Sequence, residues 1–278
     1  MNEEFPDLKK EEIAPYKICY SKNIPLSIKL ILESPRILRV VNKEHQQLKS
    51  IIQKYNIDVV ISDNRFGLYN SKVECIYITH QLNIRAGLFS LMANKVHHYF
   101  IKKFNSIWVP DFENEGLALA GKLSKNHHFK NLIYIGPLSR LTFLEPANKV
   151  FDYLCLLSGP EPLRTEFEKQ LIEKSKNTDK KICIVRGTYS EHNYNLSDNV
   201  VLNNMPEAND LSLMIQNSEM VICRSGYSTL MDLHQLKKSN IILIPTPCQP
   251  EQNYLAEYWS QKFGANVIYQ KDLKKLFF

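Results

Sequence analysis

The chain has 278 residues, of which 44% are hydrophobic and 23% charged, and 35 Lys plus Arg against 29 Asp plus Glu give a net charge of +6. This length suits two ordinary domains, and a moderate, dispersed charge argues against nucleic acid as a partner. No apolar run approaches the roughly 20 residues of a membrane helix, and the six cysteines lack Cys-x-x-Cys spacing. We therefore expect reduced core thiols in a cytoplasmic protein without a cofactor.

Helical stretches alternate with short apolar runs along the chain, which is the pattern of βα units around a parallel sheet. We therefore expect an α/β fold. The first half predicts a short strand near Lys17 to Tyr20 and a helix over Pro25 to Tyr55, which Pro35 breaks or bends. Four more strands are expected near Ile57 to Ser62, Cys75 to Thr79, Ser106 to Pro110 and Leu132 to Ile135.

Polar residues at strand ends are the first candidates for chemistry. Asp63 follows the apolar run Val59 to Ile61, so its carboxylate is expected at the carboxyl end of a strand. His80 follows the next strand in the same way, and either side chain suits a general base. An equally weighted alternative is that Asp63 caps a turn and pairs with Arg65.

The stretch Leu91 to Phe104 mixes apolar and basic residues with helical spacing. We favour a helix with one face in the core and its lysines in water, and keep contact with a membrane surface as the alternative. The adjacent pairs His97-His98 and His127-His128 lack ligand spacing, so we expect no metal site.

A linker is predicted over residues 139–150, which contain Pro146 and show no clear periodicity. It divides the chain into an N-terminal domain, residues 1–138, and a C-terminal domain, residues 151–278. The second domain should contain strands near Tyr153 to Leu157, Lys181 to Arg186, Val200 to Leu202, Met220 to Cys223, Ile241 to Ile244 and Asn266 to Tyr269.

The most informative segment runs from Val221 to Asp232, where a buried strand enters a small-residue turn and then a helix. Free N–H groups at such a helix start suit a phosphate, and Ser228 and Thr229 add two hydroxyls. Asp232 lies one turn further on the same side, where its carboxylate can accept hydrogen bonds from a ribose. The alternative is a capping box of Thr229 and Asp232 that only closes the helix.

Two neighbouring segments strengthen the prediction of a nucleotide site. Glu251 and Gln252 follow the apolar strand Ile241 to Ile244, at the edge of a parallel sheet where ligands bind. Arg186 follows another strand and can face a pyrophosphate. An equally weighted alternative is that Arg186 is a surface residue beside a glycine turn.

Together, these motifs resemble the C-terminal half of glycosyltransferase family 28. The resemblance implies a GT-B fold, with two Rossmann-like domains that face each other and a nucleotide sugar, usually UDP-linked, on the C-terminal domain. It implies that Asp232 binds the ribose, that the segment Asn204-Met205 contacts the uracil, and that Glu251 and Gln252 lie near the sugar. The phosphate turn consists of Arg224, Ser225, Gly226, Ser228 and Thr229.

The resemblance extends into the first half. Thr79 to Leu88 is similar to a loop of the family that shapes the acceptor side, with His80, Asn83 and Gly87 at matching positions and with Asn64 and Arg65 nearby. Ser158 and Gly159 take the place of a glycine-rich turn. That match is looser, because Pro160 and Pro162 restrict the backbone.

The chain also departs from the family pattern. Members begin with a strand and a glycine-rich loop that holds a histidine, and nothing similar precedes Phe5. We therefore expect the first domain to be incomplete at its N-terminus, as in a fragment, a misassigned start or a decayed gene.

The resemblance implies an inverting, metal-independent hexosyltransferase that moves a sugar from a UDP-linked donor to a sugar or lipid-linked hydroxyl acceptor. Peripheral contact with the inner face of the membrane is an additional expectation. The alternatives are a sugar-nucleotide epimerase, which shares the fold, and a non-catalytic or split-subunit protein that binds the donor.

Overall fold

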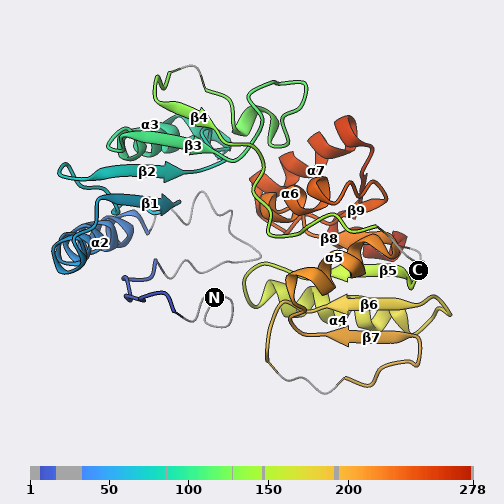
Figure 1. Ribbon diagram of the computed structural model, residues 1–278. Helices are drawn as coiled ribbons and strands as arrows, with labels where there is room; N and C mark the ends of the chain where they lie inside the picture. The colour runs from blue at the N-terminus through green and yellow to red at the C-terminus, as the bar shows by residue number, and fades with distance from the viewer. Residues whose placement is uncertain are drawn as a thin grey trace.

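The structure is a computed structural model that describes residues 7–16, 33–85, 87–126, 128–145, 148–190 and 194–276 (Figure 1). The strand expected near Lys17 to Tyr20 lies outside these ranges, as does residue 127 of the second histidine pair. Two separate parallel sheets organise the described residues. Among these residues no helix is long and apolar enough to cross a bilayer.

The first sheet has four strands in the order β1-β2-β3-β4, and all neighbours are parallel. Its helices are α2 (Ser34–Tyr55) and α3 (Ser90–Ile101), with short 3-10 turns at η1 (Gly87–Phe89) and η2 (Gly121–Leu123). Pro35 lies in the first turn of α2, where its missing N–H costs nothing, so it starts the helix and does not bend it. The strands are β1 (Val59–Asp63), β2 (Glu74–Ile78), β3 (Ser106–Val109) and β4 (Leu132–Tyr134).

The second sheet has six parallel strands in the order β10-β9-β8-β5-β6-β7. Read from β7, this is the 3-2-1-4-5-6 order of the Rossmann fold. Helices α4 (Leu163–Ser175), α5 (Ala208–Gln216), α6 (Tyr227–Gln235) and α7 (Pro250–Phe263) connect the strands, and η3 (Gln270–Lys275) follows them. The strands are β5 (Phe151–Leu156), β6 (Ile182–Val185), β7 (Val200–Asn203), β8 (Ser218–Cys223), β9 (Ile241–Leu243) and β10 (Asn266–Val267).

The ten strands expected from Ile57 onward are all present, and their ends differ from the expected ones by at most two residues. Buried parallel strands appear in the sequence as continuous apolar runs, which explains why they could be predicted. The core strands β6 and β8 show this most clearly, because Ile182–Val185 is buried throughout and Val221 to Cys223 is fully buried.

A loop of the first domain joins the core of the second. Residues 110–124 follow β3 and place Leu119 and Leu123 in one hydrophobic cluster with Leu230 and Trp259 of α6 and α7. The indole N–H of Trp259 donates to the Leu119 carbonyl at 2.9 Å. The two sheets therefore share buried contacts in addition to the linker.

Asp111 gives this loop its shape. Its buried carboxylate accepts hydrogen bonds from the backbone N–H of Leu119 at 2.7 Å and of Ala120 at 3.1 Å, and from the Ser124 hydroxyl at 2.6 Å. Because a carboxylate can only accept, it satisfies several donors that the tight loop would otherwise bury without partners.

His97 is a second buried polar group, on the core side of α3. Its Nε2 lies 2.9 Å from the Gln81 carbonyl, and its ring packs edge-on against Phe66 and Tyr77. Burial lowers the pKa of His97 from its ordinary value of 6.5 to about 4.

This pKa shift predicts a pH-dependent stability. Between pH 6.5 and 4 the unfolded chain binds a proton on His97 that the folded chain does not, so stability is full above this window and falls as the pH falls through it. The contribution is at most about 3 kcal/mol. Urea unfolding at several pH values should show a shallower pH dependence for His97→Phe than for the wild type, whereas the exposed-site control His128→Asn should follow the wild type. Parallel curves for His97→Phe and the wild type would contradict this assignment.

Candidate functional site

The C-terminal sheet reverses its winding between β5 and β8, and this is where open α/β sheets bind ligands. The two strands pair in parallel with Leu156 opposite Cys223, so their carboxyl ends are level. The turn after β5, residues 157–162, and the turn after β8, residues 224–226, therefore emerge side by side. These are the two turns that the sequence predicted for the donor.

The turn after β8 leads directly into α6. Gly226 is the N-cap residue in an extended conformation, and no side chain caps the helix. Ser225 is buried and donates its hydroxyl to the Gln252 carbonyl at 2.8 Å, whereas Ser228 is exposed and Thr229 half-buried. The alternative of a Thr229–Asp232 capping box is therefore wrong, and the helix start keeps uncapped N–H groups beside two hydroxyls.

Asp232 lies on α6, one turn beyond this start. Its carboxylate accepts a hydrogen bond from the Ser139 hydroxyl of the linker at 2.6 Å. Burial raises the pKa of Asp232, and the Ser139 hydrogen bond partly opposes this shift. A ribose at this carboxylate would either share it with, or displace, a hydroxyl of the chain itself.

The Arg224 guanidinium is engaged in the core. It donates to the Ile244 carbonyl at 3.1 Å and to the Gln270 side chain at 2.8 Å, and it stacks on Phe167 at 4.0 Å. Burial lowers the pKa of Arg224 to about 10. The Arg224 side chain thus holds the adjoining strand ends together, and the place of this residue in the donor turn stays a prediction.

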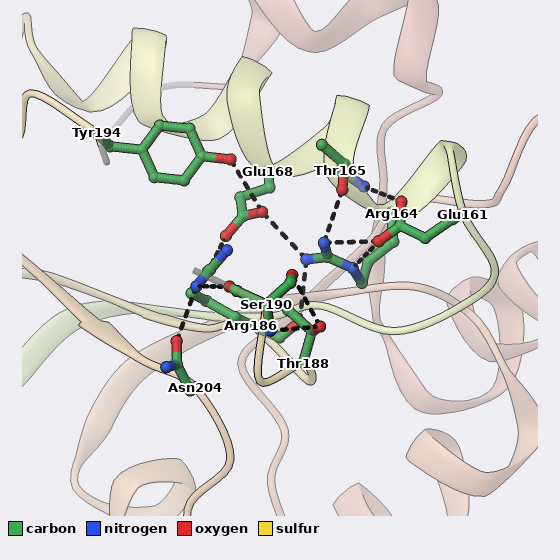
Figure 2. A network of polar contacts seen from close by, with 9 residues as sticks. All are labelled: Glu161, Arg164, Thr165, Glu168, Arg186, Thr188, Ser190, Tyr194 and Asn204. Atoms are coloured by element: carbon green, nitrogen blue, oxygen red, sulfur yellow. Dashed lines mark hydrogen bonds and ion pairs between the residues drawn. The ribbon is translucent and has the colours of Figure 1, made fainter. Parts of the chain in front are cut away.

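Arg186 belongs to a buried ionic network (Figure 2). It pairs with the buried Glu168 and donates to the Ser190 carbonyl and the Asn204 side chain, both at 2.8 Å. Arg164 pairs with the other oxygen of Glu168 at 3.1 Å.

The network balances its own charge. Arg164 also donates to Glu161 at 2.7 Å, so two guanidinium groups meet two carboxylates. Such pairing compensates the cost of burying each charge. The alternative of a surface arginine is wrong, because Arg186 is buried. Its Nη2 makes no hydrogen bond with the described residues, and its role at a pyrophosphate stays a prediction.

The other candidates on the donor side lie on the same edge of the sheet. Ser158 is half-buried and Gly159 has φ +98°, a conformation that favours glycine. Asn204 and Met205 follow β7, and the Asn204 carbonyl accepts a hydrogen bond from Gly187 at 2.9 Å. The Met205 side chain is 44% exposed.

His80 and Glu251 meet across the two domains. His80 Nε2 lies 2.8 Å from a carboxylate oxygen of Glu251, in the first turn of α7. The imidazole also stacks on Tyr227 of α6, with ring centres 4.2 Å apart. The neighbouring Gln252 uses its side chain within its own turn, accepting from Thr246 N–H at 2.9 Å.

The acceptor-side candidates are more dispersed. Asp63 is exposed at the end of β1, opposite Ile78 in the sheet, and the Asn64 amide lies 3.5 Å from it. Arg65 pairs with the buried Glu44 at 2.5 Å, so the expected Asp63–Arg65 pair is wrong.

The loop after β2 carries two further acceptor-side candidates, Asn83 and Gly87. Asn83 donates to the carbonyls of Lys122 and Lys125 at 2.8 and 2.5 Å, which shapes the loop and uses its side chain internally. Gly87 begins η1 with φ +59°.

Sequence reasoning missed three buried acids, Asp111, Glu44 and Glu168. Glu44 and Glu168 pair with arginines from other elements, Arg65 and Arg186, whereas Asp111 accepts from the loop that follows it. The only local signal was for Asp111, a carboxylate directly after the strand run that ends at Pro110.

Residues 163–277 match the model of the glycosyltransferase family 28 C-terminal domain. This part of the chain is therefore similar to that domain. Over 92 residues the chain is 34% identical to the UDP-N-acetylglucosamine--N-acetylmuramyl-(pentapeptide) pyrophosphoryl-undecaprenol N-acetylglucosamine transferase of Prochlorococcus marinus, a match that covers 32% of this chain and 25% of that protein.

A second curated relative carries a different name. Over 136 residues the chain is 29% identical to a cobalt-precorrin-6A reductase of Methanocaldococcus jannaschii, covering 48% of this chain and 51% of that protein. The chain thus spans about half or less of the curated relatives it matches.

Solved structures show the fold. The glycotransferase of kitacinnamycin superposes with a TM-score of 0.61 and 14% identity, over 94% of this chain and 74% of that one. A spinosyn rhamnosyltransferase has a TM-score of 0.60 and 13% identity, and the match covers 90% of this chain and 69% of that one. Acinetobacter baumannii MurG has a TM-score of 0.50 and 12% identity, and the match covers 97% of this chain and 74% of that one. The fold is therefore that of the GT-B glycosyltransferases, with two Rossmann-like domains.

Asp111 provides a test of the loop that joins the domains. In Asp111→Asn one acceptor oxygen becomes an NH₂ group that faces buried donors, so we expect a loss of about 1–3 kcal/mol in the free energy of unfolding. The control Asp179→Asn changes an exposed carboxylate and should stay within about 0.5 kcal/mol of the wild type. Equal stability of Asp111→Asn and the wild type in urea unfolding would contradict this role.

Proposed function

We propose that this protein transfers a hexosyl group from a nucleotide sugar, a UDP sugar in our reading, to a hydroxyl acceptor by a metal-independent, inverting displacement. The observation that carries the proposal is the uncapped start of α6 at the switch point of a family 28 domain. A GT-B fold over most of the chain supports it. The solved structures named above are glycosyltransferases and not reductases.

In this proposal, one edge of the C-terminal sheet binds the phosphates, the ribose and the base of the donor. The N–H groups at the start of α6, with the hydroxyls of Ser228 and Thr229, hold the phosphates, and the helix dipole offsets their negative charge. Asp232 takes the ribose hydroxyls in exchange for Ser139. The backbone at Asn204 and Met205 contacts the base, and the turn at Ser158 and Gly159 closes the other side of the crevice.

A binding measurement tests this donor site. We expect UDP to bind in calorimetry more tightly than TDP or ADP, and Asp232→Asn to weaken UDP by about tenfold, because an amide accepts fewer hydrogen bonds from the ribose. The control Asp210→Asn, an exposed carboxylate on α5, should bind as the wild type does.

The alternatives give different results in that experiment. A folded chain that does not bind UDP would refute the donor site. A chain that binds UDP but transfers no sugar would support a donor-binding subunit, for which addition of a separate N-terminal piece is the next test.

The acceptor side includes an apolar surface on α3. His97, Phe100 and Ile101 are buried, as the sequence predicted for one face of this helix. The opposite face exposes an apolar stripe, Met92, Val96 and Tyr99, which we call the α3 stripe, together with the exposed Lys95 and Lys102.

We assign the α3 stripe to contact with an anionic membrane surface that carries a lipid-linked acceptor. Apolar side chains flanked by lysines suit a bilayer interface with negative headgroups. The Prochlorococcus relative supports this, because its name specifies an undecaprenol-linked acceptor.

Vesicle flotation tests the α3 stripe. Met92→Ser/Val96→Ser should bind vesicles with phosphatidylglycerol about tenfold more weakly than the wild type, because two apolar side chains no longer enter the interface. The control Leu38→Ser removes an exposed leucine from α2 and should leave binding unchanged. Equal flotation of the double variant and the wild type would contradict the assignment.

A further inference from the structure

We propose that His80 and Glu251 act as a catalytic dyad assembled from both domains, with His80 as the general base and Glu251 as its positioning residue. This inference rests on the proposed transferase function. It assigns Glu251 to the activation of the acceptor, whereas the family resemblance in the sequence implied a position near the donor sugar.

The geometry fixes one nitrogen of His80. Nε2 lies 2.8 Å from Glu251, a hydrogen-bonding distance. An ionised carboxylate can only accept, so Nε2 carries the proton and the lone pair of the neutral ring is on Nδ1. No described residue makes a hydrogen bond with Nδ1. This nitrogen is therefore the one that can take a proton from a substrate.

Tyr227 also holds the orientation of the ring. It stacks on the imidazole face with ring centres 4.2 Å apart, and its own hydroxyl donates to the Pro110 carbonyl at 2.7 Å. The backbone around His80 is fixed by the Gln81 N–H, which donates to the Thr79 hydroxyl at 3.1 Å. Such support resembles the fixed histidine of other acid–base sites, where a carboxylate holds the ring and its tautomer.

The dyad also lies where both substrates meet. His80 lies two residues beyond the end of β2 in the first domain, and Glu251 lies in the first turn of α7 in the second. Tyr227, on which His80 stacks, is the residue before Ser228 at the proposed phosphate site. The His80 and Glu251 side chains are 18% and 33% exposed, so the pair is accessible from solvent.

The rival base is less well oriented. Asp63 is exposed at the end of β1, and its described hydrogen-bond partner is the adjacent Asn64 at 3.5 Å. A base without an orienting partner loses the benefit of a fixed geometry. His80 has a partner on one nitrogen and a stacked ring on its face.

The chemical step is a single displacement. The acceptor O–H proton passes to His80 Nδ1, and the acceptor oxygen forms a bond to the anomeric carbon of the donor. The bond from that carbon to the phosphate oxygen breaks, and its electron pair leaves with the nucleoside diphosphate. Glu251 stabilises the imidazolium that forms. The proton later leaves His80 for solvent.

A kinetic cycle tests the dyad on the full chain with a UDP sugar and a hydroxyl acceptor. We expect His80→Asn to lower kcat by at least about 100-fold, Glu251→Gln to lower it by about 10–100-fold, and the double variant to resemble His80→Asn. The calorimetric Kd for UDP and for the intact UDP sugar should change by less than about twofold in each variant. The control Glu257→Gln, on the same helix, should retain wild-type kcat.

Two outcomes would overturn the dyad. If Glu251→Gln weakens binding of the UDP sugar and its effect on kcat adds to that of His80→Asn, Glu251 holds the donor. If the wild type binds UDP but transfers nothing, His80 is not a base. Failure of the wild type to bind UDP would instead refute the proposed function.

Nitrogen NMR of the histidine rings supplies a readout that does not depend on turnover. At a pH where His80 is neutral, its spectrum, assigned by loss of the signal in His80→Asn, should show a proton on Nε2 and none on Nδ1. A proton on Nδ1 would overturn the dyad, because the lone pair would then face Glu251.

Discussion

The burial of one loop of the first domain in the core of the second is the constraint on which the site depends. Residues 110–124 leave β3, fold around the Asp111 carboxylate and place Leu119 against Trp259. This contact brings the end of β2 to the start of α7, which is why His80 reaches Glu251. The contacts of His80 with Glu251 and of Arg85 with Tyr254 add to this joint between the two domains.

The charges at the donor site are arranged differently from what motifs suggest. Both arginines that the sequence placed near a phosphate are buried and engaged, one on Phe167 and one on Glu168. The α6 helix start and Arg140, which acts on Asp232, contribute positive potential at the crevice. A helix dipole is weaker than a full charge but is fixed in place.

Much of the fold could be predicted from the sequence, because buried parallel strands are continuous apolar runs and turns carry small residues. The candidate site could be predicted only in part. Local motifs located the turn at Ser225 and Gly226, but hydrogen-bond partners depend on contacts between distant segments. His80 and Glu251 are 171 positions apart, and no local pattern specifies that they meet.

The hydrogen bond from Ser139 to Asp232 has a mechanical consequence. Ser139 lies in the segment that connects the domains, and Asp232 lies beside the helix start that we assign to the donor. In the proposed donor complex, a ribose that displaces the Ser139 hydroxyl removes one contact between the connecting segment and α6, whereas the contact of Leu138 N–H with Met231 remains. In that proposal, donor affinity and the position of the connecting segment are linked, so each alters the other by the same free energy.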